Sequence, residues 1–121
     1  MMTEGSWFPL HIEESDQPSI NYLHTPDRSD PKFEKLPFAK KVWIVIPANQ
    51  SHHVELLMEL LVPPEDKWCD NFLGHRYILA NPQILTDFNI DYYLNAQEEG
   101  DFIIVAARAY HTGMYHTLFE F

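Results

Sequence analysis

The sequence predicts a mainly β fold with a short helical insertion. Strand-like segments lie near both ends of the chain and helix-like segments lie between them, an order that disfavours a parallel βαβ sheet. The predicted strands are short and the chain holds only four glycines, which fits a barrel or a double-sheet sandwich. With 121 residues, the chain is expected to form a single domain.

Three strands are predicted in the first part of the chain. Residues 7–12 combine aromatic and β-type residues, and residues 19–24 form a second segment of this kind. Residues 25–31 are polar and contain two prolines, which is typical of a surface loop, and we expect a loop insertion over residues 25–40. Residues 41–46 give the strongest β signal.

The middle of the chain, residues 51–94, is predicted to be the helical insertion. Ser51 is expected to cap a helix that runs to about Leu61 and stops before two prolines at 63–64. Apolar residues recur at helical spacing on one face of this helix, at Val54, Leu57, Met58 and Leu61. An Asn-Pro pair at 81–82 predicts the start of a second, short helix.

The C-terminal part of the chain returns to β structure. Residues 95–100 predict a polar turn, and residues 101–106 predict a strand. Residues 115–121 are expected to begin a last strand that is cut short, which would leave a sheet edge unpaired.

Composition narrows the classes of function. No apolar run approaches the ~20 residues that a membrane span needs. The net charge of −10 disfavours direct binding to nucleic acid and fits a basic peptide partner, although acidity also serves solubility alone. A single cysteine excludes an internal disulfide, so we expect a reducing, intracellular compartment.

One set of side chains has the spacing of a metal site. His11 and Glu13 are two residues apart on a predicted strand, so both side chains project from the same face. With the distant His111 they could form a facial triad, which suits non-haem Fe(II) and leaves positions open for an oxygen-activating cosubstrate. Because the chain has seven histidines, spacing alone equally allows a hydrogen-bonded core or surface histidine.

Seven sequence blocks cover nearly the whole chain in the order found in one known family. They are FPLHIEE at 8–14, SINYLH at 19–24, KVWIVIP at 41–47, CDNFLGH at 69–75, NPQIL at 81–85, QEEGDFII at 97–104 and YHTG at 110–113. The series resembles a Jumonji-C (JmjC) domain, and most of all the histone trimethyl-lysine demethylases that pair a JmjN segment with JmjC. We expect the chain to be such a domain truncated at both ends.

The resemblance implies a double-stranded β-helix, the cupin or jelly-roll architecture, and a dioxygenase that uses Fe(II) and 2-oxoglutarate. His11, Glu13 and His111 match the iron ligands. The implied activity is nuclear demethylation of histone lysine, in which an N-methyl group is hydroxylated and lost as formaldehyde. Two alternatives stay open: an inactive JmjC-like fragment that serves as an interaction module, and an enzyme that hydroxylates a protein side chain.

The resemblance also implies a cosubstrate pocket. Lys41 matches the lysine that binds the distal carboxylate of 2-oxoglutarate, a sensible counter-ion for an ammonium group. Phe8, Asn21 and Trp43 match positions that line the same pocket. The alternative for Phe8 and Trp43 is core packing, and the alternative for Lys41 is a solvated strand end.

Cys69 and His75 match two of the four ligands of a zinc site in the same class of demethylases. The other two ligands would be cysteines beyond the last iron ligand, but the sequence has one cysteine in total. Zinc is therefore expected only if the missing ligands are supplied elsewhere, because a closed structural zinc site needs four. The alternative for Cys69 is a buried free thiol.

Overall fold

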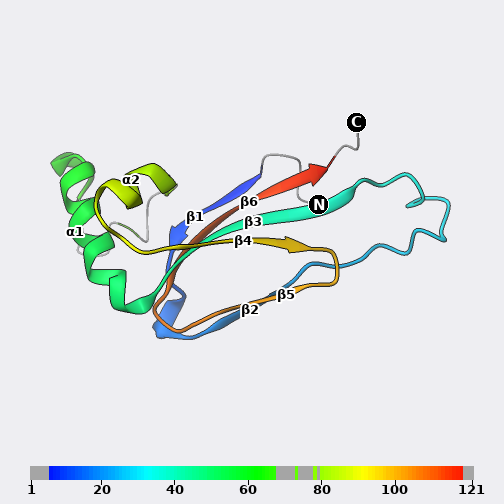
Figure 1. Cartoon of the computed structure of the whole chain (residues 1–121), viewed down its shortest axis with the longest axis horizontal. Coiled ribbons are helices and arrows are strands. Elements are labelled where there is room, and N and C mark those ends of the chain that lie inside the picture. Colours follow the sequence, from blue (N-terminus) through cyan, green and yellow to red (C-terminus); the bar gives the residue numbers. More distant parts are fainter. Residues whose placement is uncertain (1–5, 68–72, 74–77, 79, 119–121) are drawn as a thin grey trace.

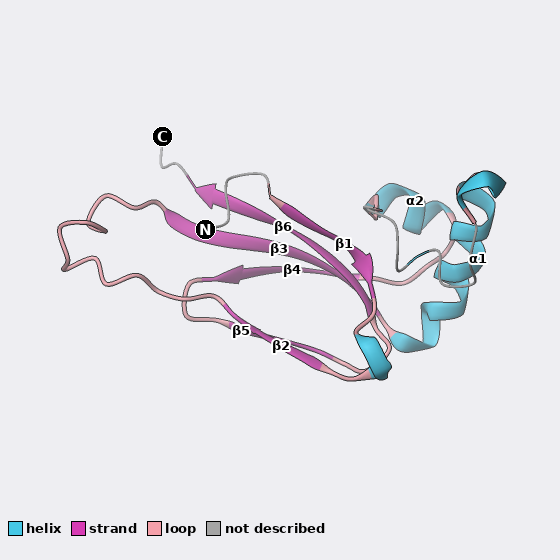
Figure 2. Cartoon of the chain, turned by 180° about the vertical axis from the view of Figure 1, so that it is seen from behind, coloured by secondary structure: helices cyan, strands magenta, loops and turns pink. Residues whose placement is uncertain are grey.

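Two antiparallel sheets face each other in the computed structural model, which describes residues 6–67, 73, 78 and 80–118. The larger sheet has the strand order β1-β6-β3-β4, and the smaller sheet pairs β2 with β5 (Figure 1; Figure 2). The strands are β1 (Trp7–His11), β2 (Ser19–Tyr22), β3 (Phe38–Ile46), β4 (Tyr93–Glu98), β5 (Phe102–Val105) and β6 (Tyr110–Leu118). This architecture confirms the predicted mainly β, jelly-roll-like fold class.

Two helices, α1 (Ser51–Leu61) and α2 (Pro82–Asp87), lie at one end of the larger sheet, and a long loop extends from the other end (Figure 1). Apolar side chains of both helices pack with that end of the sheet in one core cluster: Leu10, Ile46, Val54, Leu57, Met58, Ala80, Leu85, Ile90 and Tyr110. A second, smaller cluster around Trp43 and Val105 fills the space between the two sheets. Among the described residues, no helix is long and apolar enough to cross a membrane.

The helix boundaries follow the predicted start and stop signals, with one exception. Helix α1 ends at Leu61 ahead of the proline pair, and the side chain of Asn81 caps α2 by accepting from the N–H of Gln83 at 2.9 Å. Ser51 does not cap α1, because a turn of 3-10 helix at Ala48–Gln50 precedes it and Ser51 is already helical. Its hydroxyl is therefore free to bond elsewhere.

Several predicted strand boundaries are wrong. Strand β3 begins at Phe38, within the predicted 25–40 loop, and β4 occupies most of the predicted turn at 95–100 and the last two residues of the 51–94 segment. Strand β4 lies at a sheet edge and buries only Gln97, so its sequence carries no alternation of apolar and polar residues. Strand β6 begins at Tyr110, and it is no unpaired edge because it lies between β1 and β3.

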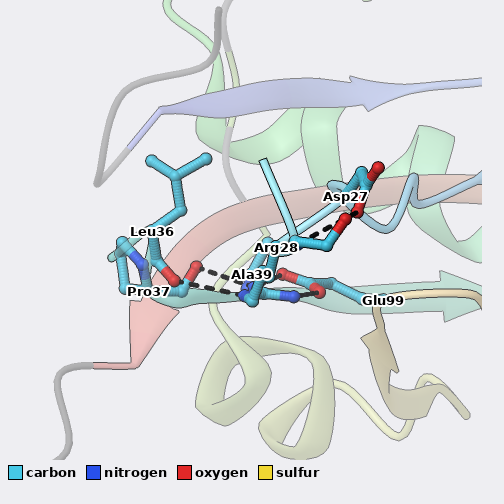
Figure 3. Close-up of polar contacts among 7 residues, drawn as sticks. Asp27, Arg28, Leu36, Pro37, Ala39 and Glu99 are labelled. Atoms are coloured by element: carbon cyan, nitrogen blue, oxygen red, sulfur yellow. Dashed lines mark hydrogen bonds and ion pairs between the residues drawn. The ribbon is translucent and has the colours of Figure 1, made fainter. Parts of the chain in front are cut away.

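One ion pair ties the long loop between β2 and β3 to the turn between β4 and β5 (Figure 3). The Arg28 guanidinium donates two hydrogen bonds of 2.7 Å to the Glu99 carboxylate, which also accepts from the N–H of Ala39 at 2.8 Å. The guanidinium also donates to the carbonyls of Leu36 and Pro37 at the end of the loop. Arg28 thus joins the C-terminal end of the loop to the turn between β4 and β5.

We expect Glu99→Gln to lower the melting temperature by about 5 °C at pH 7, because the Glu99 side chain is only 6% exposed and accepts three hydrogen bonds. The hydrogen bonds from Arg28 lower the pKa of Glu99 from its ordinary value of 4.5. A lowered pKa stabilises the fold above pH 4.5, and this stabilisation is lost as the pH falls through the folded value. The difference between parent and variant should therefore shrink on acidification, measured by thermal melts from pH 7 to pH 3.

Glu98→Gln is the matched control for that experiment. Glu98 is the neighbouring carboxylate, 66% exposed, and pairs with Lys40 at 3.1 Å. An exposed ion pair contributes little, so this variant should melt within about 1 °C of the parent. An equal drop in melting temperature in both variants would show that the burial and hydrogen bonds of Glu99 add no stability beyond that of an exposed carboxylate.

Candidate metal centre

Three side chains with metal-ligating atoms meet where β1 and β6 pair. His11 is the last residue of β1, Glu13 follows two residues later, and His111 is the second residue of β6, directly opposite His11 in the antiparallel register. The Glu13 Oε1 lies 3.8 Å from Nε2 of His11 and 3.2 Å from Nε2 of His111. One ligand atom from each residue lies within 4.8 Å of the others, so the group could hold a metal ion.

A bulge in β1 aims His11 at this group. Phe8 pairs with Gly113 but His11 pairs with His111, so β1 holds one extra residue between them, in a stretch that includes Pro9. A bulge with one extra residue turns the following side chains to the opposite face. The hydroxyl of Thr112 donates to the Phe8 carbonyl at 2.7 Å and fixes the start of the bulge.

Both imidazoles are held in the tautomer that a metal ligand needs. Nδ1 of His11 lies 2.7 Å from the Pro9 carbonyl, and Nδ1 of His111 lies 3.0 Å from the Ala109 carbonyl. A carbonyl can only accept, so each Nδ1 carries the proton and each Nε2 offers its lone pair. Such backbone contacts are the usual way to orient a ligating histidine.

Burial favours the neutral form of His111, which is the form that binds metal. The side chain is 3% exposed, and this burial lowers the pKa of His111 although the hydrogen bond to Ala109 and the charge of Glu13 act in the opposite direction. His11 and Glu13 are each about one-third exposed and border an open cavity of about 1030 Å³. The centre therefore has one buried wall and one open side.

Lys41 lies inside the space between the sheets and not at a solvated strand end. It is 5% exposed, in the row of the larger sheet formed with Gln97 and Tyr115. Its Nζ donates to the Asn21 side chain at 3.3 Å, and burial lowers the pKa of Lys41. Among the described residues no carboxylate forms an ion pair with this ammonium.

Phe8 and Trp43 lie between the histidines and Lys41. Their rings contact each other edge to face at 4.9 Å, and Phe8 lies 6.0 Å from the His11 ring and 6.2 Å from the His111 ring. The Lys41 ammonium lies 4.8 Å from the Trp43 ring centre and 5.5 Å from that of Phe8. The structure thus brings all seven predicted iron and cosubstrate residues to the space between the two sheets.

Gln97 was missed because its segment predicts a turn. It is fully buried, accepts from the Trp43 indole N–H at 2.9 Å, and donates to the carbonyls of Asn21 and Asp101 across to the smaller sheet. Gln97 therefore fixes the Trp43 ring and joins the sheets behind Lys41. The sequence offered one signal for such a residue, because a buried indole N–H needs a hydrogen-bond acceptor. This signal does not identify which residue accepts.

Two other expectations concern residues near the ends of the site. Cys69 and His75, the predicted zinc pair, lie outside the described residues. Met114 and Tyr115 follow His111 at positions where the resemblance predicts that they narrow the pocket. Met114 is half exposed and shares a row with Trp7 and Val42, on the sheet face opposite to Lys41, whereas Tyr115 shares the row of Lys41.

Comparison with known protein families matches residues 1–118 to the family described as JmjC domain, hydroxylase. Over 115 residues the chain is 31% identical to "Probable lysine-specific demethylase 4F" of Homo sapiens and 31% identical to "Lysine-specific demethylase 4D" of Rattus norvegicus. It is 33% identical to "Lysine-specific demethylase 4B" of Mus musculus. Each match covers 93% of this chain but only 16%, 20% and 10% of the respective relatives, so the chain spans a fifth of their length or less.

Proposed function

Because the chain belongs to the JmjC domain family, we propose that it is an Fe(II)- and 2-oxoglutarate-dependent dioxygenase domain that removes methyl groups from lysine in a histone tail. The observation that carries the proposal is the His11–Glu13–His111 group, whose ligand atoms lie within 4.8 Å of one another. Two imidazoles and one carboxylate are the donor set that non-haem Fe(II) oxygenases use.

Each residue has a defined part in this proposal. When bound, iron with 2-oxoglutarate and O₂ supplies the oxidising power that hydroxylates an N-methyl group. His11, Glu13 and His111 would hold the metal from one side, and the Lys41 ammonium would bind the distal carboxylate of 2-oxoglutarate. The rings of Phe8 and Trp43 lie between the metal ligands and Lys41 and would exclude water there. Exclusion of water strengthens the attraction between the Lys41 ammonium and the carboxylate of 2-oxoglutarate.

The charge around the open side of the centre favours a cationic substrate. The described residues that line the cavity include Glu13, Glu14 and Asp16 but no lysine or arginine. With a net charge of −10, the chain fits a methylated, basic peptide better than nucleic acid. The relatives named as lysine-specific demethylases support this substrate class, and a histone substrate would imply a nuclear location for the protein.

Binding of 2-oxoglutarate tests the proposal directly. With Mn(II) as a redox-inert substitute for iron, calorimetry should detect 2-oxoglutarate binding to the parent chain and binding about 10- to 100-fold weaker to Lys41→Met, because a charge-assisted hydrogen bond is lost. Lys41 is a buried cation without a carboxylate partner among the described residues, so methionine should leave the fold at least as stable. The thermal melt separates loss of binding from loss of fold.

Lys40→Met is the matched control, because Lys40 is the neighbouring cation and pairs with Glu98 at the surface. Its 2-oxoglutarate affinity should equal that of the parent. A parent chain that binds no 2-oxoglutarate in the presence of Mn(II) would refute the enzyme assignment and favour the alternative, an inactive domain that serves as an interaction module.

Release of formaldehyde from a trimethyl-lysine histone peptide tests the substrate class. An acidic trimethyl-lysine peptide serves for comparison.

A further inference from the structure

The turn that precedes β6 contains the backbone carbonyl that contacts the His111 ring. In residues 106–109 the chain reverses direction, with an N–H to carbonyl bond of 3.2 Å from Ala109 to Ala106 and with Arg108 at a positive φ of 61°. The carbonyl of Ala109 is the group that holds Nδ1 of His111. A group that fixes the peptides on both sides of Ala109 therefore fixes the direction of the Nε2 lone pair.

Helix α1 supplies two such contacts. The hydroxyl of Ser51, which does not cap the helix, donates to the Arg108 carbonyl at 2.8 Å, and Ser51 is 8% exposed. One turn later, the carboxylate of Glu55 accepts from the hydroxyl of Tyr110 at 3.3 Å. The helix thus holds the residue before Ala109 by its backbone and the residue after Ala109 by its side chain.

We propose that Ser51 and Glu55 are positioning residues of the metal centre, which hold the Ala109 carbonyl in place so that it orients His111. The inference rests on the proposed function, since it assigns a role toward the metal. Neither residue contacts the ligand atoms. Outer contacts of this kind typically change metal affinity by about 10- to 100-fold when they are removed.

Metal titration of the whole chain tests the inference without any measurement of activity. Ser51→Ala should bind Mn(II) about 10-fold more weakly and should alter the visible absorption spectrum of bound Co(II), which reports ligand geometry. Ser51→Thr keeps a hydroxyl and should restore both readouts. Glu55 is half exposed, so Glu55→Ala should not disturb folding. This variant should also weaken Mn(II) binding, but by less than Ser51→Ala does.

Two matched controls separate positioning from general loss of stability. Thr86→Ala removes a hydroxyl that donates to the Pro82 carbonyl at 3.0 Å in α2, and Glu59→Ala removes a carboxylate of α1 that pairs with Lys67. Both controls should bind Mn(II) as the parent does. If Ser51→Ala binds Mn(II) and Co(II) like the parent, the positioning role is refuted while the proposed function stands; if the parent binds neither metal, both are refuted.

Discussion

Replacing His111 with alanine should weaken Mn(II) binding by more than about 100-fold, since removal of a contact beyond the ligands already weakens such sites about 10- to 100-fold. His111 is the most buried of the three ligand residues, and its Nε2 lies 3.2 Å from the Glu13 carboxylate. Without it the group keeps one imidazole and one carboxylate, both about one-third exposed. Titration with Mn(II), followed by electron paramagnetic resonance of the free ion, measures the loss.

Thermal melts provide a second readout of the same change. A metal that binds only the folded state raises the melting temperature of the parent, and the His111→Ala variant should show no such rise at equal Mn(II). His53→Ala is the control, because His53 is exposed on α1 and outside the group. Parent-like Mn(II) affinity in His111→Ala would refute the assignment of this residue as a ligand.

Local signals predicted the helices and the position of most strands. The apolar spacing of α1 and the Asn-Pro start of α2 are properties of neighbouring residues, so they can be recognised without a structure. The extent of β4 and of β6 depends on pairing with β3, and pairing leaves little trace in an exposed or polar strand. Burial of Lys41 in the middle of β3 likewise depends on the smaller sheet that covers it.

The candidate site also combines features that neighbouring residues indicate with features that depend on the folded structure. The spacing of His11 and Glu13 indicates two ligands on one strand, but Glu13 lies beyond the end of β1 and a bulge brings His11 into line. Spacing alone does not single out His111 among the seven histidines, because it lies 98 positions after Glu13 in the chain (111 − 13), and the resemblance to JmjC domains supports its choice. The contacts that orient the ligands involve backbone carbonyls, which every residue has, so no residue type marks them.

Gly113→Ala should destabilise the fold by about 1–3 kcal/mol and weaken Mn(II) binding about 10-fold. A Cβ at this position would lie 2.5 Å from Cε1 of Phe8, 2.6 Å from its Cζ and 2.9 Å from the backbone carbonyl oxygen of Val42. Alanine normally stabilises a strand relative to glycine by limiting the unfolded chain. Here the overlap outweighs that gain, because Phe8 is held against Trp43 at 4.9 Å.

The Phe8 ring connects the overlap to the metal centre, because the same ring lies about 6 Å from both ligating imidazoles. A double-mutant cycle isolates this connection: in a Phe8→Leu background, Gly113→Ala should destabilise less, measured by urea unfolding. The Phe8→Leu background should restore only part of the lost stability, because the added Cβ still overlaps the backbone carbonyl oxygen of Val42, which no side-chain substitution removes. Equal losses of stability in both backgrounds would show that Phe8 does not require a glycine across the strand pair.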